Sequence, residues 1–410
     1  MDADLILASP LKLNESLAIK NRFFKSAMSE QLGDRHHDPT PQLAQLYRLW
    51  SEGGVGISVT GNVMVDRTAL GEPGNVVLDK HSDLARFRQW AEQGSGHDTQ
   101  LWMQLNHPGK QIPAMLCKEP LAPSAIPLGR GLESNFNTPK AMTEAQILAT
   151  IDAFAYAAKQ AKACGFDGVQ IHAAHGYLIS QFLSPRHNQR SDQWGGSSEA
   201  RQRFVLEVFG AIRQAVGPTF PVGIKLNSAD FMKDGFSQAE SMAVVEALAE
   251  AGVDLIEISG GTYESPSMVG AGVKASTLKR EAYFLEYAEL LRQRIDTPLV
   301  VTGGFRSTKA MEQAVADKVT DMVGVARSMA LIPDLPTRAL ADPAFVADVT
   351  RRTTGFKALD RAAMLDITWY EAQLRRMAQG KSPKPRLSAW GVLVEIFIAL
   401  GTHAFIKRRA

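Results

Sequence analysis

A regular alternation of short apolar runs with amphipathic helical patterns is the feature that most constrains the fold of this chain. Eight runs rich in β-branched and apolar residues predict buried strands. They are Arg22 to Met28, Gly54 to Gly61, Gln100 to Leu105, Gly168 to His172, Val222 to Asn227, Leu255 to Gly260, Leu299 to Gly303 and Met322 to Ala326. Eight strand–helix alternations predict a closed (β/α)8 TIM barrel of the α/β class rather than an open doubly wound sheet.

Amphipathic helices are expected between these strands. The clearest begins at Thr143, whose hydroxyl is placed to form a capping box with Gln146, and an apolar face follows it. Further helices are predicted at Glu199 to Val216, Ala239 to Ala251, Phe284 to Arg294 and Ser307 to Val315.

Two segments lie outside this alternation. His107 to Met142 is rich in proline, glycine and asparagine, which predicts a long loop or small hairpin excursion over the barrel mouth after the third strand. Residues after 336 predict a C-terminal helical extension. We therefore expect a barrel over residues 1–336 and an extension with an apolar tail over residues 337–410. Within the barrel, the loop from Arg186 to Gly196 is expected to fix the rim through Arg–Asp pairing.

Composition excludes several classes of protein. A chain of 410 residues that is 45% hydrophobic can bury a large core, and its net charge of +2 gives no reason to expect nucleic acid. Two cysteines, Cys117 and Cys164, cannot build a disulfide framework. The first residues lack the basic start of a secretion signal, so we expect a cytoplasmic protein.

The end of the chain is unusually apolar from Ala389 to Ile406, with Glu395 as its only acid and a basic run after it. The run is shorter than the roughly 20 residues that a spanning helix needs, and Glu395 would lie mid-bilayer. A helix docked on the barrel or on a partner subunit is the favoured interpretation. Contact of residues 389–410 with a membrane surface is the alternative, and homo-oligomer formation stays open.

Candidate functional residues gather just past the predicted strand ends, where barrels of this kind place their chemistry. The fourth strand runs into His172-Ala173-Ala174-His175-Gly176-Tyr177, in which a sharp turn would present His172, His175 and Tyr177 on one wall. A metal pair or surface histidines are the alternatives. Metal is disfavoured because no nearby carboxylate or thiol completes a ligand set.

Two further strands carry polar groups among apolar neighbours. Gln104, at the third strand, offers a buried amide that can read a pyrimidine-like edge. Lys225 interrupts an apolar fifth strand, and a lysine in such a place needs an anion to meet it.

The seventh and eighth strands end in glycine-rich turns, Thr302-Gly303-Gly304-Phe305-Arg306 and Gly324-Val325-Ala326-Arg327-Ser328. Loops at these two positions commonly form the phosphate site of a barrel, and Arg327 adds a guanidinium clamp. These turns predict a phosphorylated cofactor at one side of the mouth.

Taken in order, these motifs resemble the Old Yellow Enzyme family of FMN-dependent ene-reductases. The resemblance covers Pro10 to Pro336 and rests on Asn21-Arg22-Phe23 with Ala27-Met28, on Gln104, on the block from His172 to Gly196, and on both glycine turns. It implies an FMN-binding barrel that takes a hydride from NADH or NADPH. The hydride then passes to an alkene conjugated with a carbonyl or nitro group.

The resemblance also implies a role for each matching position. His172 and His175 would bind the substrate oxygen, and Tyr177 would deliver a proton. Cofactor contacts are implied for Ala27, Met28, Ser29, Gly61, Gln104, His172, Lys225, Gly303, Gly304, Ala326 and Arg327. Ser29 stands where many relatives carry threonine or cysteine, and His175 where many carry asparagine.

Other functions remain compatible with the same motifs. One is a flavin-dependent NADH oxidase or a dehydrogenase acting on another substrate. Another is a membrane-associated flavoprotein that uses its apolar tail. Longer relatives that carry an iron–sulfur cluster and a second nucleotide domain are disfavoured, because the chain has only two cysteines.

Overall fold

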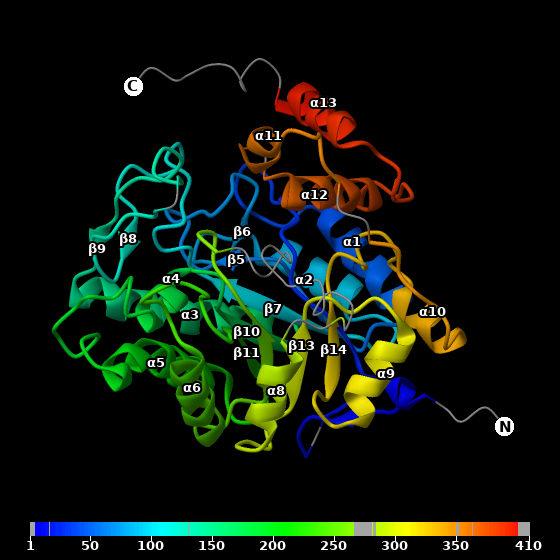
Figure 1. The fold of residues 1–410 in the computed structure, drawn as a ribbon, viewed down its shortest axis with the longest axis horizontal. Coiled ribbons are helices and arrows are strands. Elements are labelled where there is room, and N and C mark those ends of the chain that lie inside the picture. The colour runs from blue at the N-terminus through cyan, green and yellow to red at the C-terminus, as the bar shows by residue number, and fades with distance from the viewer. Residues whose placement is uncertain are drawn as a thin grey trace.

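The computed structural model describes residues 5–400 except 16, 130, 266–280, 282, 283, 350, 351 and 363, and its parallel strands close into a barrel (Figure 1). Around the barrel the strand order is β10-β11-β12-β13-β14-β3-β4-β7, and β7 pairs back with β10. The eight predicted strands and the (β/α)8 fold are confirmed. They are β3 (Phe23–Lys25), β4 (Ile57–Val59), β7 (Gln100–Asn106), β10 (Gly168–Ala173), β11 (Val222–Asn227), β12 (Leu255–Ser259), β13 (Leu299–Thr302) and β14 (Met322–Val325).

Helices surround the barrel as the sequence predicts. Thr143 caps the longest of them, and its backbone N–H donates to Gln146 Oε1 at 2.9 Å in the predicted capping box. The outer helices are α1 (Pro41–Glu52), α2 (Leu84–Gly94), α3 (Glu144–Ala163), α4 (Leu178–Leu183), α5 (Ser198–Val216), α6 (Gln238–Glu250), α8 (Leu285–Arg292), α9 (Thr308–Ala316) and α10 (Leu335–Ala341).

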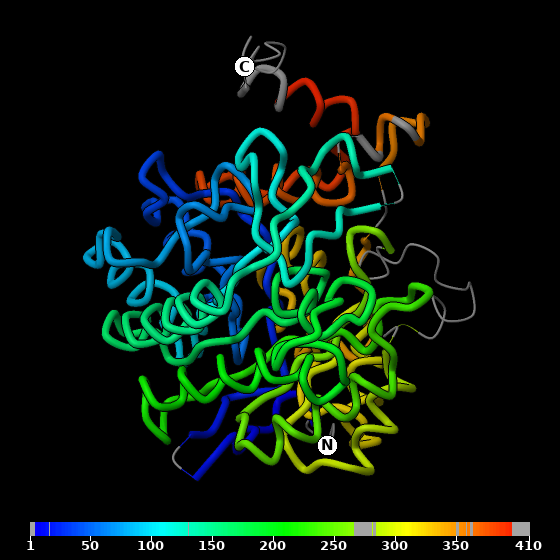
Figure 2. Tube along the Cα trace, turned by 90° about the vertical axis from the view of Figure 1, so that its left-hand side faces the viewer, coloured from blue at the N-terminus to red at the C-terminus, as the bar shows by residue number. Residues whose placement is uncertain are grey.

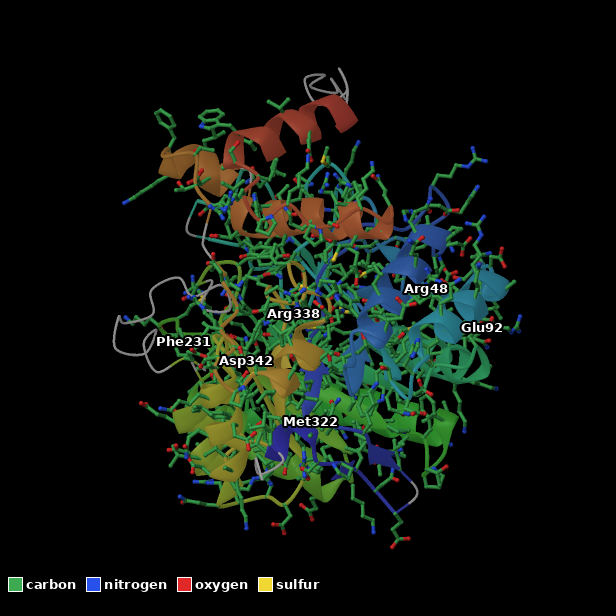
Figure 3. All side chains as sticks on the ribbon, turned by 90° about the vertical axis from the view of Figure 1, so that its right-hand side faces the viewer. Arg48, Glu92, Phe231, Met322, Arg338 and Asp342 are labelled. Atoms are coloured by element: carbon green, nitrogen blue, oxygen red, sulfur yellow. The ribbon has the colours of Figure 1, made fainter. Side chains whose placement is uncertain are left out.

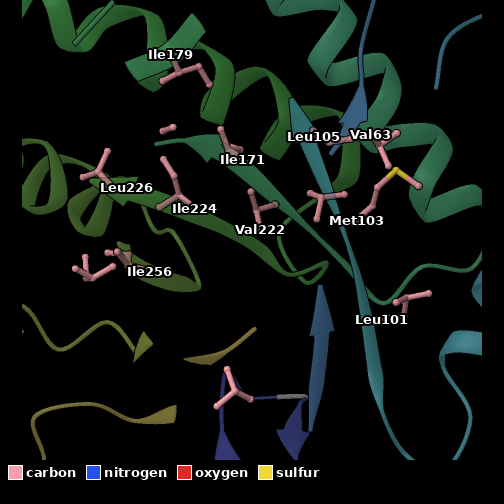
Figure 4. Close-up of a cluster of buried hydrophobic side chains, with 14 of the residues drawn as sticks. Val63, Leu101, Met103, Leu105, Ile171, Ile179, Val222, Ile224, Leu226 and Ile256 are labelled. Carbon is pink, nitrogen blue, oxygen red and sulfur yellow. The ribbon is translucent and has the colours of Figure 1, made fainter. Parts of the chain in front are cut away.

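Alternate residues of each strand face opposite sides of the barrel wall. Met103, Leu105, Ile171 and Ile224 point outward and are fully buried in the main core between strands and helices (Figure 4). The residues between them point into the barrel. Arg48 of α1 shows the opposite arrangement, a charged side chain on the outer face of a helix (Figure 3).

The amino-terminal end of the barrel is filled by a second apolar cluster around Trp102. A small antiparallel pair, β1 (Leu11–Lys12) with β2 (Ala18–Ile19), contributes Leu11 and Ile19 to this cluster. Gly168 and Gly223 make room for the indole, since a Cβ on either would lie 2.6 Å or 2.8 Å from its ring atoms. The carboxyl end is thereby left for the functional site.

Substituting Gly168 by alanine is therefore expected to destabilise the protein by about 1–3 kcal/mol, because the rigid, fully buried Trp102 ring cannot move aside. The urea midpoint of the holoenzyme measures this change. Gly210→Ala in α5 is the matched control, since its new methyl group would meet nothing within 4 Å. It should be neutral or stabilising by up to about 1 kcal/mol. Equal destabilisation by both substitutions would contradict the packing argument.

The excursion after β7 lies at the carboxyl end of the barrel. It holds β8 (Leu121–Ala122) and β9 (Lys140–Ala141), which pair in parallel, and one antiparallel bridge between Pro113 and Phe136. Two more strands, β5 (Val63–Met64) and β6 (Val76–Val77), extend the sheet from β7.

Arg190 pairs with Asp192 at 2.5 Å and donates to the carbonyls of Pro123 and Met142. The predicted Arg–Asp pair thus also ties the rim to the excursion.

Helices α11 (Lys357–Ala362), α12 (Leu365–Ala378) and α13 (Ala389–Leu400) lie at the same end of the molecule as the excursion (Figures 1 and 2). Ala389 and Val392 of α13 are buried in the core, whereas Trp390 and Val394 are exposed. The described part of the predicted apolar tail is therefore a helix with one docked face. No helix among the described residues is long and apolar enough to cross a membrane, and residues 401–410 lie outside the described range.

Candidate active site

A cavity of about 1790 Å³ opens at the carboxyl end of the barrel, beneath the excursion and α12. It brings together all of the predicted site residues except Gly61. Its lining includes Ala27, Met28, Ser29, Gln104, His172, His175, Tyr177, Lys225, Gly303, Gly304, Ala326 and Arg327. The strand ends place these side chains around one space although they span 300 positions of sequence.

The turn after β10 presents three of these groups on one wall. His175 has φ +61°, a left-handed conformation uncommon for a residue with a side chain, and Gly176 follows with φ +79°. The His172 ring centroid lies 5.2 Å from that of His175 and 4.8 Å from that of Tyr177. The predicted sharp turn is thus present, and α4 begins directly after Tyr177.

Both imidazoles are neutral hydrogen-bonding groups at pH 7. Burial lowers the pKa of His172 and of His175 well below the usual value, and the positive charge of Lys225 adds to the effect. The Ala174 N–H donates to His172 Nδ1 at 3.2 Å, so the ring proton of His172 is on Nε2. His175 Nε2 shares a 2.9 Å hydrogen bond with Ser259 Oγ.

Tyr177 stays protonated through the physiological pH range. Burial, and next the charge of Glu72, raise the pKa of its phenol to about 12. The hydroxyl lies 2.9 Å from that of Tyr263, and Asn62 Nδ2 lies 3.5 Å from it. Tyr177 is therefore a protonated phenol held in place beside the imidazole pair.

A chain of hydrogen bonds crosses the barrel beneath the cavity. Gln104 Nε2 donates to Gln170 Oε1 at 2.7 Å, and Gln170 Nε2 donates to Glu257 Oε2 at 2.8 Å. Thr302 Oγ1 donates to Glu257 Oε1 at 2.7 Å and lies 2.8 Å from Ser26 Oγ. Gln104 Oε1 is buried and has no hydrogen-bond partner among the described residues. It is an acceptor that a bound ligand can satisfy.

Lys225 lines the cavity. Its counter-ion is a carboxylate of the protein itself, which the sequence pattern did not reveal. Its Nζ lies 3.0 Å from Glu257 Oε1, and the carboxylate of Glu257 is fully buried. The two residues sit in register on neighbouring strands β11 and β12. A bound anion is therefore not needed to explain why this lysine is buried.

The other side of the mouth has the features of a phosphate site. Gly303 and Gly304 have φ values of +122° and +100°, which permit close backbone approach by a ligand. Arg306 and Arg327 both line the cavity next to them. Two guanidinium groups and glycine backbone at one edge match the predicted anion-binding end.

The wall from the first strand differs in detail from the expectation. Gly61 lies behind this wall, since a Cβ there would lie 2.3 Å from the Met28 carbonyl oxygen. Its N–H donates to Glu30 Oε1 at 3.0 Å rather than to a ligand. Ser29 lines the cavity, but its hydroxyl donates to Glu72 Oε2. Ser29 therefore offers the cavity acceptor lone pairs only.

Several lining residues were missed by the sequence analysis: Asn62, Glu72, Ser259, Tyr263, Arg306, Tyr370 and Glu371. Arg306 was visible in a recognised glycine turn. Ser259 is the last residue of β12, and the others lie in loops or in α12, where no strand-end pattern points to them.

A cavity with a glycine and arginine edge at the carboxyl end of a (β/α)8 barrel is typical of enzymes that bind a phosphorylated cofactor. The family model described as "NADH:flavin oxidoreductase / NADH oxidase family" matches residues 7–342. The chain belongs to this family, and the predicted Old Yellow Enzyme relationship is confirmed. It is an NAD(P)H-dependent flavin oxidoreductase with FMN as cofactor.

Individual relatives agree with this assignment. An NADH-dependent flavin oxidoreductase of Hypocrea jecorina is 38% identical over 357 residues, which cover 82% of this chain and 88% of that protein. An NADPH dehydrogenase of Geobacillus sp. is 31% identical, with 82% and 94% of the two chains covered. The structure of an old yellow enzyme homologue from Zymomonas mobilis has the same fold, with a TM-score of 0.69 and 22% sequence identity. The match covers 84% of this chain and 94% of that one.

The residues present fit FMN. The unpartnered Gln104 Oε1 matches the N–H of a flavin pyrimidine edge, and the apolar side chains of Ala27 and Met28 suit a flat ring. The glycine and arginine edge suits its phosphate.

Proposed function

We propose that this enzyme is an ene-reductase that acts on alkenes conjugated with a carbonyl or nitro group. The observation that carries the proposal is the wall formed by His172, His175 and Tyr177. Two neutral imidazoles and a protonated phenol meet there within one cavity. This combination suits a reaction in which negative charge grows on an oxygen and a carbon then takes a proton.

Residues that would hold FMN follow from their places around the cavity. Ala27, Met28 and Ser29 would contact the ring, with Gly61 supporting them from behind. Gln104 and Lys225 would contact its polar edge, and the phosphate would be bound by Gly303, Gly304, Ala326 and Arg327. When bound, FMN supplies the redox chemistry, taking a hydride from NADH or NADPH and giving one to the alkene.

The imidazoles are proposed to bind the substrate's carbonyl or nitro oxygen. His172 Nε2–H is a donor because Nδ1 is already an acceptor. Charge that builds on the oxygen during reduction strengthens these hydrogen bonds, and each such donor typically lowers the barrier by about 3 kcal/mol. Lys225, whose charge is felt by both rings, favours the same developing anion.

Tyr177 is proposed to protonate the substrate's α-carbon. Its raised pKa keeps the proton in place until a strongly basic carbon forms. Tyr263, hydrogen-bonded to it at 2.9 Å, orients the hydroxyl.

Anaerobic half-reactions test the proposal. The holoenzyme is expected to be bleached by NADH or NADPH, and 2-cyclohexenone or a nitroalkene should then restore its yellow colour within one turnover. Reoxidation by oxygen alone, with no reaction toward any enone or nitroalkene, would favour an NADH oxidase instead. A colourless protein that FMN cannot reconstitute would contradict the cofactor contacts.

A further inference from the structure

An acidic corner of the cavity lies outside the proposed chemistry. Glu72, in the loop between β5 and β6, and Glu371 of α12 both line the cavity although 299 positions separate them. Tyr177 and Tyr263 line the same cavity. Burial raises the pKa of Tyr263, and the charges of Tyr177, Glu72 and Glu371 raise it further. The acidic corner therefore adjoins the proposed proton donor.

Glu371 has an oxygen that the protein leaves without a donor. The side chain is only 4% exposed, and its Oε2 accepts from Gln31 Nε2 at 2.9 Å. Its Oε1 is buried and has no hydrogen-bond partner among the described residues. An unsatisfied buried carboxylate oxygen is costly, so this atom is suited to accept from a ligand in the cavity.

Positive charge is also scarce at this corner. Within the described chain, neither Glu72 nor Glu371 has a lysine or arginine nitrogen at ion-pair distance. Burial, and next the charge of Glu72, raise the pKa of Glu371 to about 8. The hydrogen bond from Gln31 and the charge of Arg375 oppose this rise, and the charge of Glu30 adds to it. Burial likewise raises the pKa of Glu72. A cation at this corner would favour the ionised form of both carboxyls.

We propose that Glu72 and Glu371 form a subsite for a cationic group, so that the preferred substrates are activated alkenes that also carry a protonated or quaternary amine. This inference rests on the proposed function, because it uses the imidazole pair to hold the other end of the substrate. The oxygen would bind at His172 and His175 and the cation at the acidic corner. Tyr177, in contact with His172, and Tyr263, in contact with Tyr177, line the same cavity.

Two ketones of equal shape test the subsite without turnover. They are 4-(trimethylammonio)acetophenone and 4-tert-butylacetophenone, which differ in charge and lack a reducible alkene. Calorimetric titration of the oxidised holoenzyme at pH 9 should show the cation binding about tenfold tighter, as a charge-assisted contact with a buried carboxylate implies. Equal affinities at pH 9 would overturn the proposal.

The pH dependence gives a second, independent measurement on the unaltered enzyme. Glu371 becomes protonated as the pH falls through about 8, so the advantage of the cation should shrink between pH 9 and pH 6.5. The quaternary ammonium does not titrate, so its own charge cannot cause this change. An advantage that stays constant over this range would contradict a role for Glu371.

Substitutions test whether the preference for the cationic ketone depends on Glu371 or on acidic residues elsewhere. Glu371→Gln keeps the shape but removes the charge, and it should bind the two ketones within about twofold of each other. Glu207→Gln on the exposed face of α5 is the matched control and should keep the full preference. A retained preference in a folded Glu371→Gln enzyme would overturn the assignment.

Reduction of 2-cyclohexenone by the unaltered enzyme distinguishes the two proposals. If the enzyme reduces this neutral enone but shows no charge preference, the subsite is wrong and the ene-reductase function stands. If it shows the preference but reduces no enone, the subsite stands and the reaction is wrong.

Discussion

His172→Ala is expected to slow reoxidation of the reduced enzyme by 2-cyclohexenone by about 10²- to 10³-fold, the usual loss when one donor to a developing oxyanion is removed. His172 lines the cavity, and its ring proton is on Nε2 because Nδ1 accepts from the Ala174 N–H. Reduction by NADH or NADPH develops no negative charge on a substrate oxygen, so this half-reaction should change much less. Stopped-flow absorbance at the flavin band measures both rates.

The exposed His81 provides the control for this experiment. His81→Ala removes an imidazole that is not part of the cavity lining and should alter neither half-reaction. FMN content must be equal in all samples, because His172 is also an implied cofactor contact. Equal losses in the two half-reactions of His172→Ala would argue against its role as an oxygen donor.

Tyr177→Phe is expected to lower turnover of enones by about 10²-fold or more, the range for loss of a positioned general acid. Consumption of a nitroalkene should be nearly unchanged, because its nitronate product is stable enough to leave without a proton. Protonation is the only step that this hydroxyl is proposed to perform. Single-turnover rates with 2-cyclohexenone and with a nitroalkene provide the comparison.

Tyr156→Phe is the matched substitution on the exposed face of α3 and should leave both substrates unaffected. Similar slowing of the enone and the nitroalkene in Tyr177→Phe would remove Tyr177 from the protonation step. It would point instead to a role in substrate binding shared with Tyr263.

The barrel could be predicted because its signals are local. Each strand is a short apolar run, and the capping box at Thr143 is readable within four residues. Residues at strand ends, such as Gln104 and His172, were found in the same way, since the fold fixes where strand ends meet. Their chemical roles stay predictions that the half-reaction experiments test.

The remaining site residues depend on contacts between distant segments. Glu257 looks like one charged residue in an apolar strand until the closed barrel places it beside Lys225. Glu371 belongs to a helix whose docking over the mouth no periodicity predicts. Ser29 could be assigned to the cavity wall from the sequence. Its hydrogen bond to Glu72 could not be predicted, because it depends on the fold of the chain between the two residues.

The position of α12 also has a consequence for biosynthesis. Its Glu371 accepts from Gln31, near the start of the chain, and helix α12 packs on α1. During translation the barrel strands leave the ribosome first, and the wall formed by α12 can be added only after residue 378 has emerged. A nascent barrel therefore has an open mouth, and the cavity acquires its final shape only after α12 has been synthesised and has docked.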